Sequence, residues 1–532
     1  MGGCTDTDQG RQNLEQFWTC YKAIDPAHAF FQEGHQERKP SNTLVFALHG
    51  DEGHGAKKGN TCVISMETCL GLPNMDSQWD ATRCSGCKVS DKGRNRFKLA
   101  HGPTHQTVGD TPLCANQVTN LKHNSFLTKF VLGVLPNKYY NSTGVLDAFM
   151  GELCLAFKEL FTNGVVVNSQ RWFLAIVGLK GDLRWYEKIC NLERCFNKQL
   201  GNAKCMCHEC AAGSQSVPWE DFRHQPLWGH HLFPERPWRE SNPPAICEIP
   251  FNSATPEKMI KRDLFHNTKV GVLRDFCGSS IMLILHFGFF NGPRGEVSNS
   301  RDALLERAHD HFLWYCKTTS HYPALHSFTP IFFNATRSWH HAWVNTKASD
   351  TTIMIGWIKV LAHACLCETQ DERQKAALET IIKAATWVQG WERIVYGHGL
   401  WLTKTCGAVL YEYFHDFIQA YNKLAHMCLY SFRVPGFAMK AKLHMLTHTK
   451  YELYCQLMDP DTIWVLNPAI WSCDMCEDVV GKLSRLSRRV SPQIPARRTL
   501  DLYLIKCKAA YGRYKEIKSV YKTKLKKRHP KK

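Results

Sequence analysis

Short apolar runs in the first third of the chain predict the strands of a sheet. Four such runs are rich in β-branched and aromatic residues and have the length of a strand, at residues 43–48, 61–66, 130–135 and 173–179. Between the third and fourth runs, apolar residues recur at every third or fourth position over residues 143–161, which predicts a helix. The expected order is therefore strand, strand, strand, helix, strand.

The pattern changes on either side of this region. A short amphipathic helix is expected over residues 13–24, a loop rich in Trp and Pro follows residue 213, and from Arg301 to about Tyr430 the periodicity is almost entirely helical. The clearest helices are expected at residues 372–391 and 405–429. We divide the chain into an N-terminal helix and linker (1–40), the first part of a core (41–213), a loop-rich segment (214–300), a helical block (301–440), late helices that complete the core (441–505) and a basic tail (506–532).

An acidic residue follows each of two predicted strands. Asp51 comes after the first strand and Asp182 after the fourth, and sheets of this kind carry their chemistry at strand ends. The strand order resembles that of the ribonuclease H-like fold, in which the first strand runs beside the fourth. Adjacent carboxylates repel each other unless divalent cations bridge them. Other interpretations are a turn at Asp51, a metal site that combines it with His49 and His54, and a helix N-cap at Asp182.

The 24 cysteines are spread over a long chain, and most are expected to be reduced, buried thiols. Cys205, Cys207, His208 and Cys210 crowd into six positions, a density typical of a zinc knuckle. Because zinc needs four soft ligands, Cys207 and Cys210 require two more. The candidates are Cys84 with Cys87, Cys190 with Cys195, or Cys205 with His208, and the alternative is a set of ordinary buried cysteines.

A second set of possible metal ligands lies later in the chain. His444 and His448 are one helical turn apart, so they share a helix face, and Cys473 with Cys476 would complete four ligands. The competing interpretation is a helix that uses one histidine for capping and the other for packing.

The positive charge of the chain is concentrated at its end. The net charge is +18, and residues 482–532 contain 18 Lys or Arg against two acids, so the rest is nearly neutral. Tyrosines interleave with these basic residues, as in segments that bind nucleic acid, and the run also resembles a nuclear-import signal. The candidate DNA contacts are Arg485, Arg488, Arg489, Lys524, Lys526, Lys527 and Arg528. We expect no membrane span and no signal peptide.

Several phrases resemble the transposase-like proteins of cut-and-paste DNA elements, closest to the CACTA and Plavaka groups. The matching phrases are LHGDEG at residues 48–53, GLKGDL at 178–183, CHEC at 207–210, DLFH at 263–266 with KVGV at 269–272, and CEDVVGK at 476–482. The resemblance extends from residue 43 to about residue 505. Unlike an intact transposase, the chain has no separate DNA-binding domain before the expected catalytic region.

The resemblance implies a magnesium- or manganese-dependent site of three acids. Asp51 and Asp182 match the first two acids. Asp263 matches an acidic phrase of the family, whereas an acid on a late helix would be Glu477, so the third acid stays open.

We therefore expect an α+β protein with a ribonuclease H-like mixed sheet, interrupted by a zinc-knuckle-like insertion and a large all-helical insertion. The expected function is that of a nuclear, transposase-derived DNA-binding protein, with a homodimer among the expected assemblies, whose ancestral chemistry is metal-dependent cleavage and transfer of DNA strands. The alternative is a nucleic-acid or chromatin-binding zinc protein without enzymatic activity.

Overall fold

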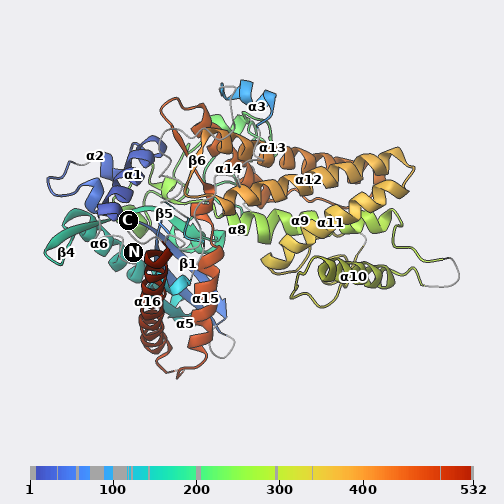
Figure 1. Ribbon diagram of the computed structural model, residues 1–532. Coiled ribbons are helices and arrows are strands. Elements are labelled where there is room, and N and C mark those ends of the chain that lie inside the picture. The colour runs from blue at the N-terminus through green and yellow to red at the C-terminus, as the bar shows by residue number, and fades with distance from the viewer. Residues whose placement is uncertain are drawn as a thin grey trace.

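The structure is a computed structural model of the whole chain. It describes residues 8–32, 34–54, 59–71, 89–99, 117, 119–121, 124–141, 144–198, 205–293, 298–337, 339–491 and 493–528, and for 517–528 the backbone alone. The protein is a mixed α+β structure, as the sequence predicts, with helices far more abundant than strands (Figure 1).

The main sheet is mixed and has five strands, in the order β3-β2-β1-β5-β4. The strands are β1 (Thr43–His54), β2 (Asn60–Thr68), β3 (Lys129–Pro136), β4 (Val165–Val167) and β5 (Gln170–Gly181). β1, β2 and β3 form an antiparallel meander, and β5 lies parallel to β1 on its other side. All four predicted strands are confirmed. The short β4, which hairpins onto β5, escaped prediction because its three valines are exposed and too few to show alternation.

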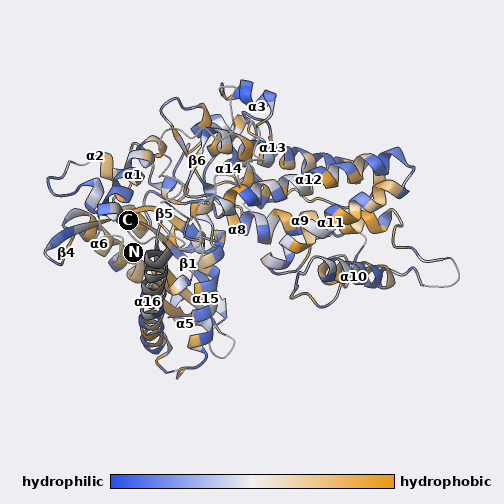
Figure 2. Cartoon of the chain, viewed as in Figure 1, coloured by the Kyte–Doolittle hydropathy of each residue, from blue (hydrophilic) through white to orange (hydrophobic). Residues whose placement is uncertain are grey.

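Helices cover both faces of the sheet. On one face, α6 (Val145–Thr162) and α7 (Leu183–Ile189) pack their apolar residues against alternate positions of β1 and β5 such as Phe46, Leu48 and Ile176. On the other face, α1 (Asp8–Ile24) packs Phe17 and Trp18 against the intervening positions. The continuous apolar run of β5, which appears in orange in Figure 2, is therefore explained by burial on both sides.

A short extended segment lies beside β5, on the side away from β1. Ile260 forms a parallel bridge with Leu179, and the Lys261 backbone N–H donates to the Leu179 carbonyl at 3.1 Å. Asp263 follows this segment and begins the short helix α8 (Leu264–Asn267), so a third acid reaches the same edge of the sheet as Asp51 and Asp182.

The largest core lies in the helical region, away from the sheet (Figure 1). It is built from α9 (Leu273–His286), α10 (Arg301–Thr318), α11 (Ala348–Glu368), α12 (Glu372–Gly397) and α13 (Lys404–His426). By length and composition α11 would also fit a membrane span, but Ile355, Trp357 and Ile358 are buried in this core. The expectation of an almost unbroken helical block is wrong for residues 319–337 and 339–347, which are irregular, and Pro323 and Pro330 oppose helix there.

The chain returns to the sheet through its last helices. α14 (Ala441–Met458) packs against α13, and the two-stranded sheet of β6 (Trp401–Thr403) and β7 (Trp464–Leu466) follows beside it. α15 (Asp474–Ser487) packs on β1, and α16 (Pro495–Arg528) lies beside α15 and over β3 (Figure 1). The remaining short helices are α2 (Ala29–Gln32), α3 (Asp91–Arg96) and α5 (Asn137–Tyr140).

Candidate functional site

Asp51 and Asp182 each follow one of two paired glycines. Gly50 of β1 pairs with Gly181, the last residue of β5, so Asp182 lies just beyond its strand. β1 continues to His54, so Asp51 lies inside the strand and not after it as the sequence predicts. Trp185 of α7 covers both glycines, and a Cβ on Gly50 would lie 2.0 Å from its indole ring. Glycine is therefore required here so that α7 can pack across the strand ends. Asp182 is also the N-cap of α7, because its Oδ1 accepts from the Trp185 N–H at 2.8 Å.

Helix α15 brings Glu477 to the same place. The helix packs on β1 where Gly53 leaves room for it, since a Cβ there would lie 2.1 Å from the Ser484 hydroxyl. Its buried residues, among them Val479 and Val480, recur at helical spacing and hold the helix on the sheet. Glu477 stands in the first turn of α15, where the helix dipole favours an acid.

Asp51, His266 and Glu477 form a cluster in which the possible ligand atoms lie within 4.8 Å of one another. The His266 Nε2 is 3.6 Å from Glu477 Oε1. Burial, the nearby Asp51 and then the more distant Asp263 raise the pKa of Glu477 far above its usual range. Burial, together with Asp51 and Asp263, also raises the pKa of Asp182, against the opposing hydrogen bond from Trp185. The carboxyl groups are thus crowded enough to resist simultaneous ionisation.

Asp263 is occupied by hydrogen bonds rather than directed at Asp51. Its carboxylate caps α8, accepts from the Phe265 N–H at 2.9 Å and from the Cys473 N–H at 2.9 Å, and pairs with His266 Nδ1. Burial alone would lower the pKa of His266, but the Asp263 carboxylate outweighs burial and holds that pKa above its ordinary value. Of the two candidates for a third acid, Glu477 is the one that the structure brings into the cluster with Asp51.

The cluster suits a hard divalent cation. Its oxygen donors are the carboxylates of Asp51 and Glu477, and carboxylate oxygen is the preferred ligand of Mg²⁺; Asp182 follows the strand beside Asp51 and is outside the three-residue cluster. Glu477 Oε1 is buried and has no hydrogen-bonding partner among the described residues. A third of the Glu477 side chain is exposed, so the cluster can also be reached from solvent.

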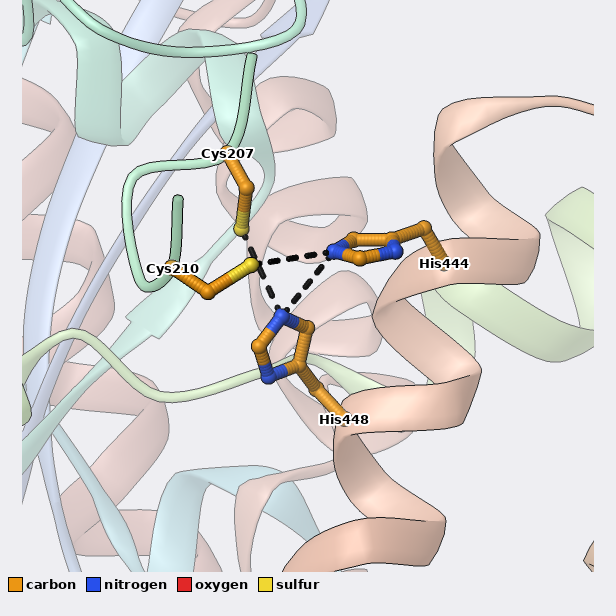
Figure 3. A group of neighbouring side chains, drawn as sticks. All are labelled: Cys207, Cys210, His444 and His448. Carbon is orange, nitrogen blue, oxygen red and sulfur yellow. Dashed lines mark hydrogen bonds between the residues drawn. The ribbon is translucent and has the colours of Figure 1, made fainter. Parts of the chain in front are cut away.

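A second group of candidate ligands is fully inside the protein. Cys207, Cys210, His444 and His448 converge from the loop after α7 and from one face of α14 (Figure 3). The distances are 3.5 Å from Cys207 Sγ to His448 Nε2, 3.4 Å from Cys210 Sγ to His444 Nε2, and 3.0 Å between the two Nε2 atoms. Tetrahedral zinc with ordinary Zn–S and Zn–N bonds would separate such atoms by roughly 3.3–3.6 Å. The donor set and its spacing therefore fit zinc.

The hydrogen bond of His444 supports a cation between these atoms. His444 Nδ1 lies 2.9 Å from the Trp219 carbonyl, which can only accept, so Nδ1 carries the hydrogen and the Nε2 lone pair faces Cys210 and His448. His448 Nδ1 lies 3.7 Å from Glu209 Oε2, beyond hydrogen-bonding distance. The outward hydrogen bond of His444 is of the kind that orients histidine ligands.

Burial fixes the protonation of this group without a metal. It raises the pKa of the Cys207 thiol and lowers the pKa of His448, so both side chains are neutral. The Trp228 ring lies 4.2 Å from the His448 ring and closes the site from solvent. A metal held here would be structural, because four protein ligands leave no open position.

The other predicted zinc ligands lie elsewhere or were not described. Cys205 and His208 are outside the four-residue group, and the nearest charged partner of His208 Nε2 is Glu209 Oε1 at 3.6 Å. Cys190 and Cys195 are buried around α7 in the sheet core. Cys84 and Cys87 fall outside the described residues. The expected pairing of His444 and His448 with Cys473 and Cys476 is not what the structure shows, because those cysteines lie near His49 instead.

Exposed basic residues lie at the end of α15 and just after it. Arg485 is exposed on α15, and Arg488 and Arg489 are exposed directly after the helix ends. On α16, Tyr503 and Tyr511 face inward instead, since Tyr503 donates to the Lys129 carbonyl and Tyr511 to the Leu127 carbonyl, both at 2.7 Å. The side chains of Lys524, Lys526, Lys527 and Arg528 are outside the described residues.

Two contributors to these sites escaped sequence reasoning. His266 belongs to the DLFH phrase, but nothing in the spacing placed it against Glu477. A Cys-x-x-Cys pair combined with a His-x-x-x-His pair is a familiar zinc-binding pattern. Cys207-x-x-Cys210 and His444-x-x-x-His448 were not combined in the sequence analysis because more than 230 residues separate them.

No protein-family model matches this chain. The curated proteins contain no match to it either.

Proposed function

We propose that this protein has a ribonuclease H-like core and cleaves and transfers DNA strands with the help of Mg²⁺ or Mn²⁺, as transposases do. The order and directions of the strands support the fold, since a meander of three strands is followed by a helix and a strand parallel to the first. The extended segment at Ile260 lies parallel to β5, on the side away from β1, where a ribonuclease H-like fold has its next parallel strand. The helical block then stands between that segment and the helix that carries the last acid.

The observation that carries the proposal is the convergence of three acids from distant parts of the chain. Asp51 of β1 clusters with Glu477 from a helix more than 400 residues later, and Asp182 directly follows β5, the strand parallel to β1. Burial and the nearby Asp51 disfavour the charged form of Glu477 and therefore raise its pKa. A fold keeps such a costly arrangement of acids where a bound cation compensates for the repulsion.

Each residue has a distinct role in this proposal. Asp51, Asp182 and Glu477 hold the cation, which supplies charge neutralisation at the scissile phosphate and a more acidic bound water. His266 is a positioning residue that keeps Glu477 in place, and Asp263 in turn orients His266 and ties it to the start of α15 through the Cys473 N–H.

DNA is the proposed partner because of charge. Arg485 is exposed on the helix that carries Glu477, Arg488 and Arg489 are exposed just after it, and the end of the chain adds further basic residues. The basic tail also supports a nuclear location as part of the proposal. The group of Cys207, Cys210, His444 and His448, which we call the Cys207 group, would then be a structural zinc site that attaches the helical region to the sheet domain.

The test is nicking of supercoiled plasmid by the purified full-length protein in Mg²⁺ or Mn²⁺. The wild-type protein is expected to nick, chelation is expected to stop it, and Asp182→Asn and Glu477→Gln are each expected to lower the rate by at least 100-fold, roughly the loss of a key transition-state contact. Glu52→Gln is the matched control, since Glu52 adjoins Asp51 in sequence but pairs with Lys188 at 2.6 Å.

The rival function makes a different prediction. A zinc protein that only binds nucleic acid would bind plasmid without nicking it, and Asp182→Asn would leave its affinity unchanged or higher. Nicking that persists in both acid variants, or that the Glu52→Gln variant loses equally, would contradict the assignment of these acids.

A further inference from the structure

A third group of metal-ligating side chains lies behind the acidic cluster. His49 of β1 and Cys473 and Cys476 at the start of α15 have possible ligand atoms within 4.8 Å of one another. All three are at most 1% exposed. Cys473-x-x-Cys476 opens a helix, so both sulfur atoms face the same side, and the third donor comes from a strand more than 400 residues earlier.

His49 has a buried nitrogen without a partner. Its Nδ1 lies 3.4 Å from the Ser65 hydroxyl, whereas its Nε2 has no hydrogen-bonding partner among the described residues. A buried polar atom left unpaired costs free energy because it has lost its bond to water. A metal on Nε2 would remove that cost, and the hydroxyl on Nδ1 would orient the ring.

The surroundings favour thiolates and offer a fourth ligand. Lys129 and Lys180 are both buried and both pair with the single carboxylate of Glu67, which leaves one buried positive charge in excess. Glu67 holds both ammonium groups near Cys476, and cations beside a cysteine favour the thiolate, the form that binds metal. Glu67 Oε2 is 3.8 Å from Cys476 Sγ, close enough to become a ligand after a small shift.

We propose that His49, Cys473 and Cys476 form a second binding site for a thiophilic divalent cation such as Zn²⁺, with Glu67 as the fourth ligand. This inference does not depend on the proposed nuclease function. The site would join α15 to β1 directly, two residues from Asp51 and one residue from Glu477. Its structural consequence is that the two elements that supply those acids are held at a fixed distance.

The experiment counts zinc per chain in the full-length protein, by inductively coupled plasma mass spectrometry. Samples are first dialysed against citrate to remove cations held weakly by carboxylates. The wild-type protein is expected to contain two equivalents, Cys476→Ser one, Cys207→Ser one and the double variant none. Cys62→Ser is the matched control, because Cys62 is equally buried on β2 and belongs to neither group. It is expected to keep both equivalents.

A second measurement on the unaltered protein guards against variants that do not fold. Co²⁺ added to the metal-free protein is expected to develop thiolate-to-cobalt absorption that saturates at two equivalents. Saturation at one equivalent, or one equivalent of zinc that Cys207→Ser alone abolishes, overturns the proposal. So does a Cys473–Cys476 disulfide found by alkylation and mass spectrometry in protein purified without oxidant.

Discussion

Loss of the Cys207 group is expected to destabilise the whole molecule, because this group connects segments that are far apart in sequence. Cys210 and His444 are 234 residues apart, and Cys207 and His448 are 241 apart. The perturbation we consider is Cys207→Ser, which keeps the size of the side chain but removes the thiolate. Three ligands remain, too few for a closed structural zinc site.

The magnitude follows from loop closure. Treating the metal as a cross-link that closes a loop of 234 residues gives roughly 5 kcal/mol of stabilisation in the chain-entropy model. That is comparable to the whole net stability of a typical domain, about 5–15 kcal/mol. We therefore expect a loss of several kcal/mol and a large fall in the unfolding midpoint.

The assay is urea unfolding followed by tryptophan fluorescence, with and without a zinc chelator. The wild-type protein is expected to lose stability when the chelator is added, and Cys207→Ser is expected to start from that lower stability and respond to the chelator much less. Cys277→Ser is the control, since Cys277 is fully buried in α9 and belongs to no group of candidate ligands. It is expected to lose a little stability and keep the chelator response.

The reasoning would be refuted by a Cys207→Ser protein with wild-type zinc content and an unchanged unfolding midpoint. An equal loss in Cys277→Ser would also refute it, because the cost would then come from burying a hydroxyl rather than from a missing ligand.

Three further predictions concern stability and DNA binding. His28 is buried with Nε2 directed at the Ile176 carbonyl and Nδ1 accepting from the Phe30 N–H, and burial lowers its pKa from 6.5 to about 4. Because the unfolded state binds the proton more readily, stability should fall by up to about 3 kcal/mol as the pH drops from 6.5 through 4, and His28→Gln should flatten that slope in urea unfolding. Gly50→Val should cost at least about 1–3 kcal/mol by urea unfolding, because the added carbons meet Trp185, whereas Gly151→Val meets open space and should cost only helix propensity. The third prediction concerns four exposed basic residues of α16, namely Lys506, Lys508, Arg513 and Lys515. Their replacement by Gln should reduce the slope of log DNA affinity against log salt concentration by up to roughly 0.9 per lost phosphate contact, measured by fluorescence anisotropy. An unchanged slope would exclude these residues from the DNA interface.

The sheet could be predicted from sequence because its strands are buried on both faces. Burial on both sides makes Phe173–Leu179 apolar throughout, and Thr43–Leu48 nearly so, which distinguishes them from the exposed β4. The parallel pairing that brings Asp51 near Asp182 followed from the strand order, although β1 runs on to His54 and Asp51 therefore lies within its strand. The third acid did not follow, because the choice between Asp263 and Glu477 depends on how α8 and α15 pack, which no local pattern encodes.

The ligand sets were hidden for the same reason. Sequence spacing pairs residues within one turn or one helix, such as Cys207 with Cys210 or His444 with His448. Whether the pair of Cys207 and Cys210 meets the histidines of α14 or the cysteines of α15 depends on where these helices pack after the helical block. Sequence reasoning placed His49 only in a possible metal site with Asp51 and His54, because nothing local connects it with Cys473 and Cys476, and a histidine in a buried strand is more often a packed core residue than a ligand.

The most direct test of the central claim is the number of Mn²⁺ ions that the zinc-loaded protein binds, measured by electron paramagnetic resonance of the free ion. The account predicts saturable binding to the wild-type protein and to Glu52→Gln, and loss of that binding in Asp51→Asn, Asp182→Asn and Glu477→Gln alike. Equal Mn²⁺ binding by the wild-type protein and the three acid variants would contradict the claim that these carboxylates share a cation.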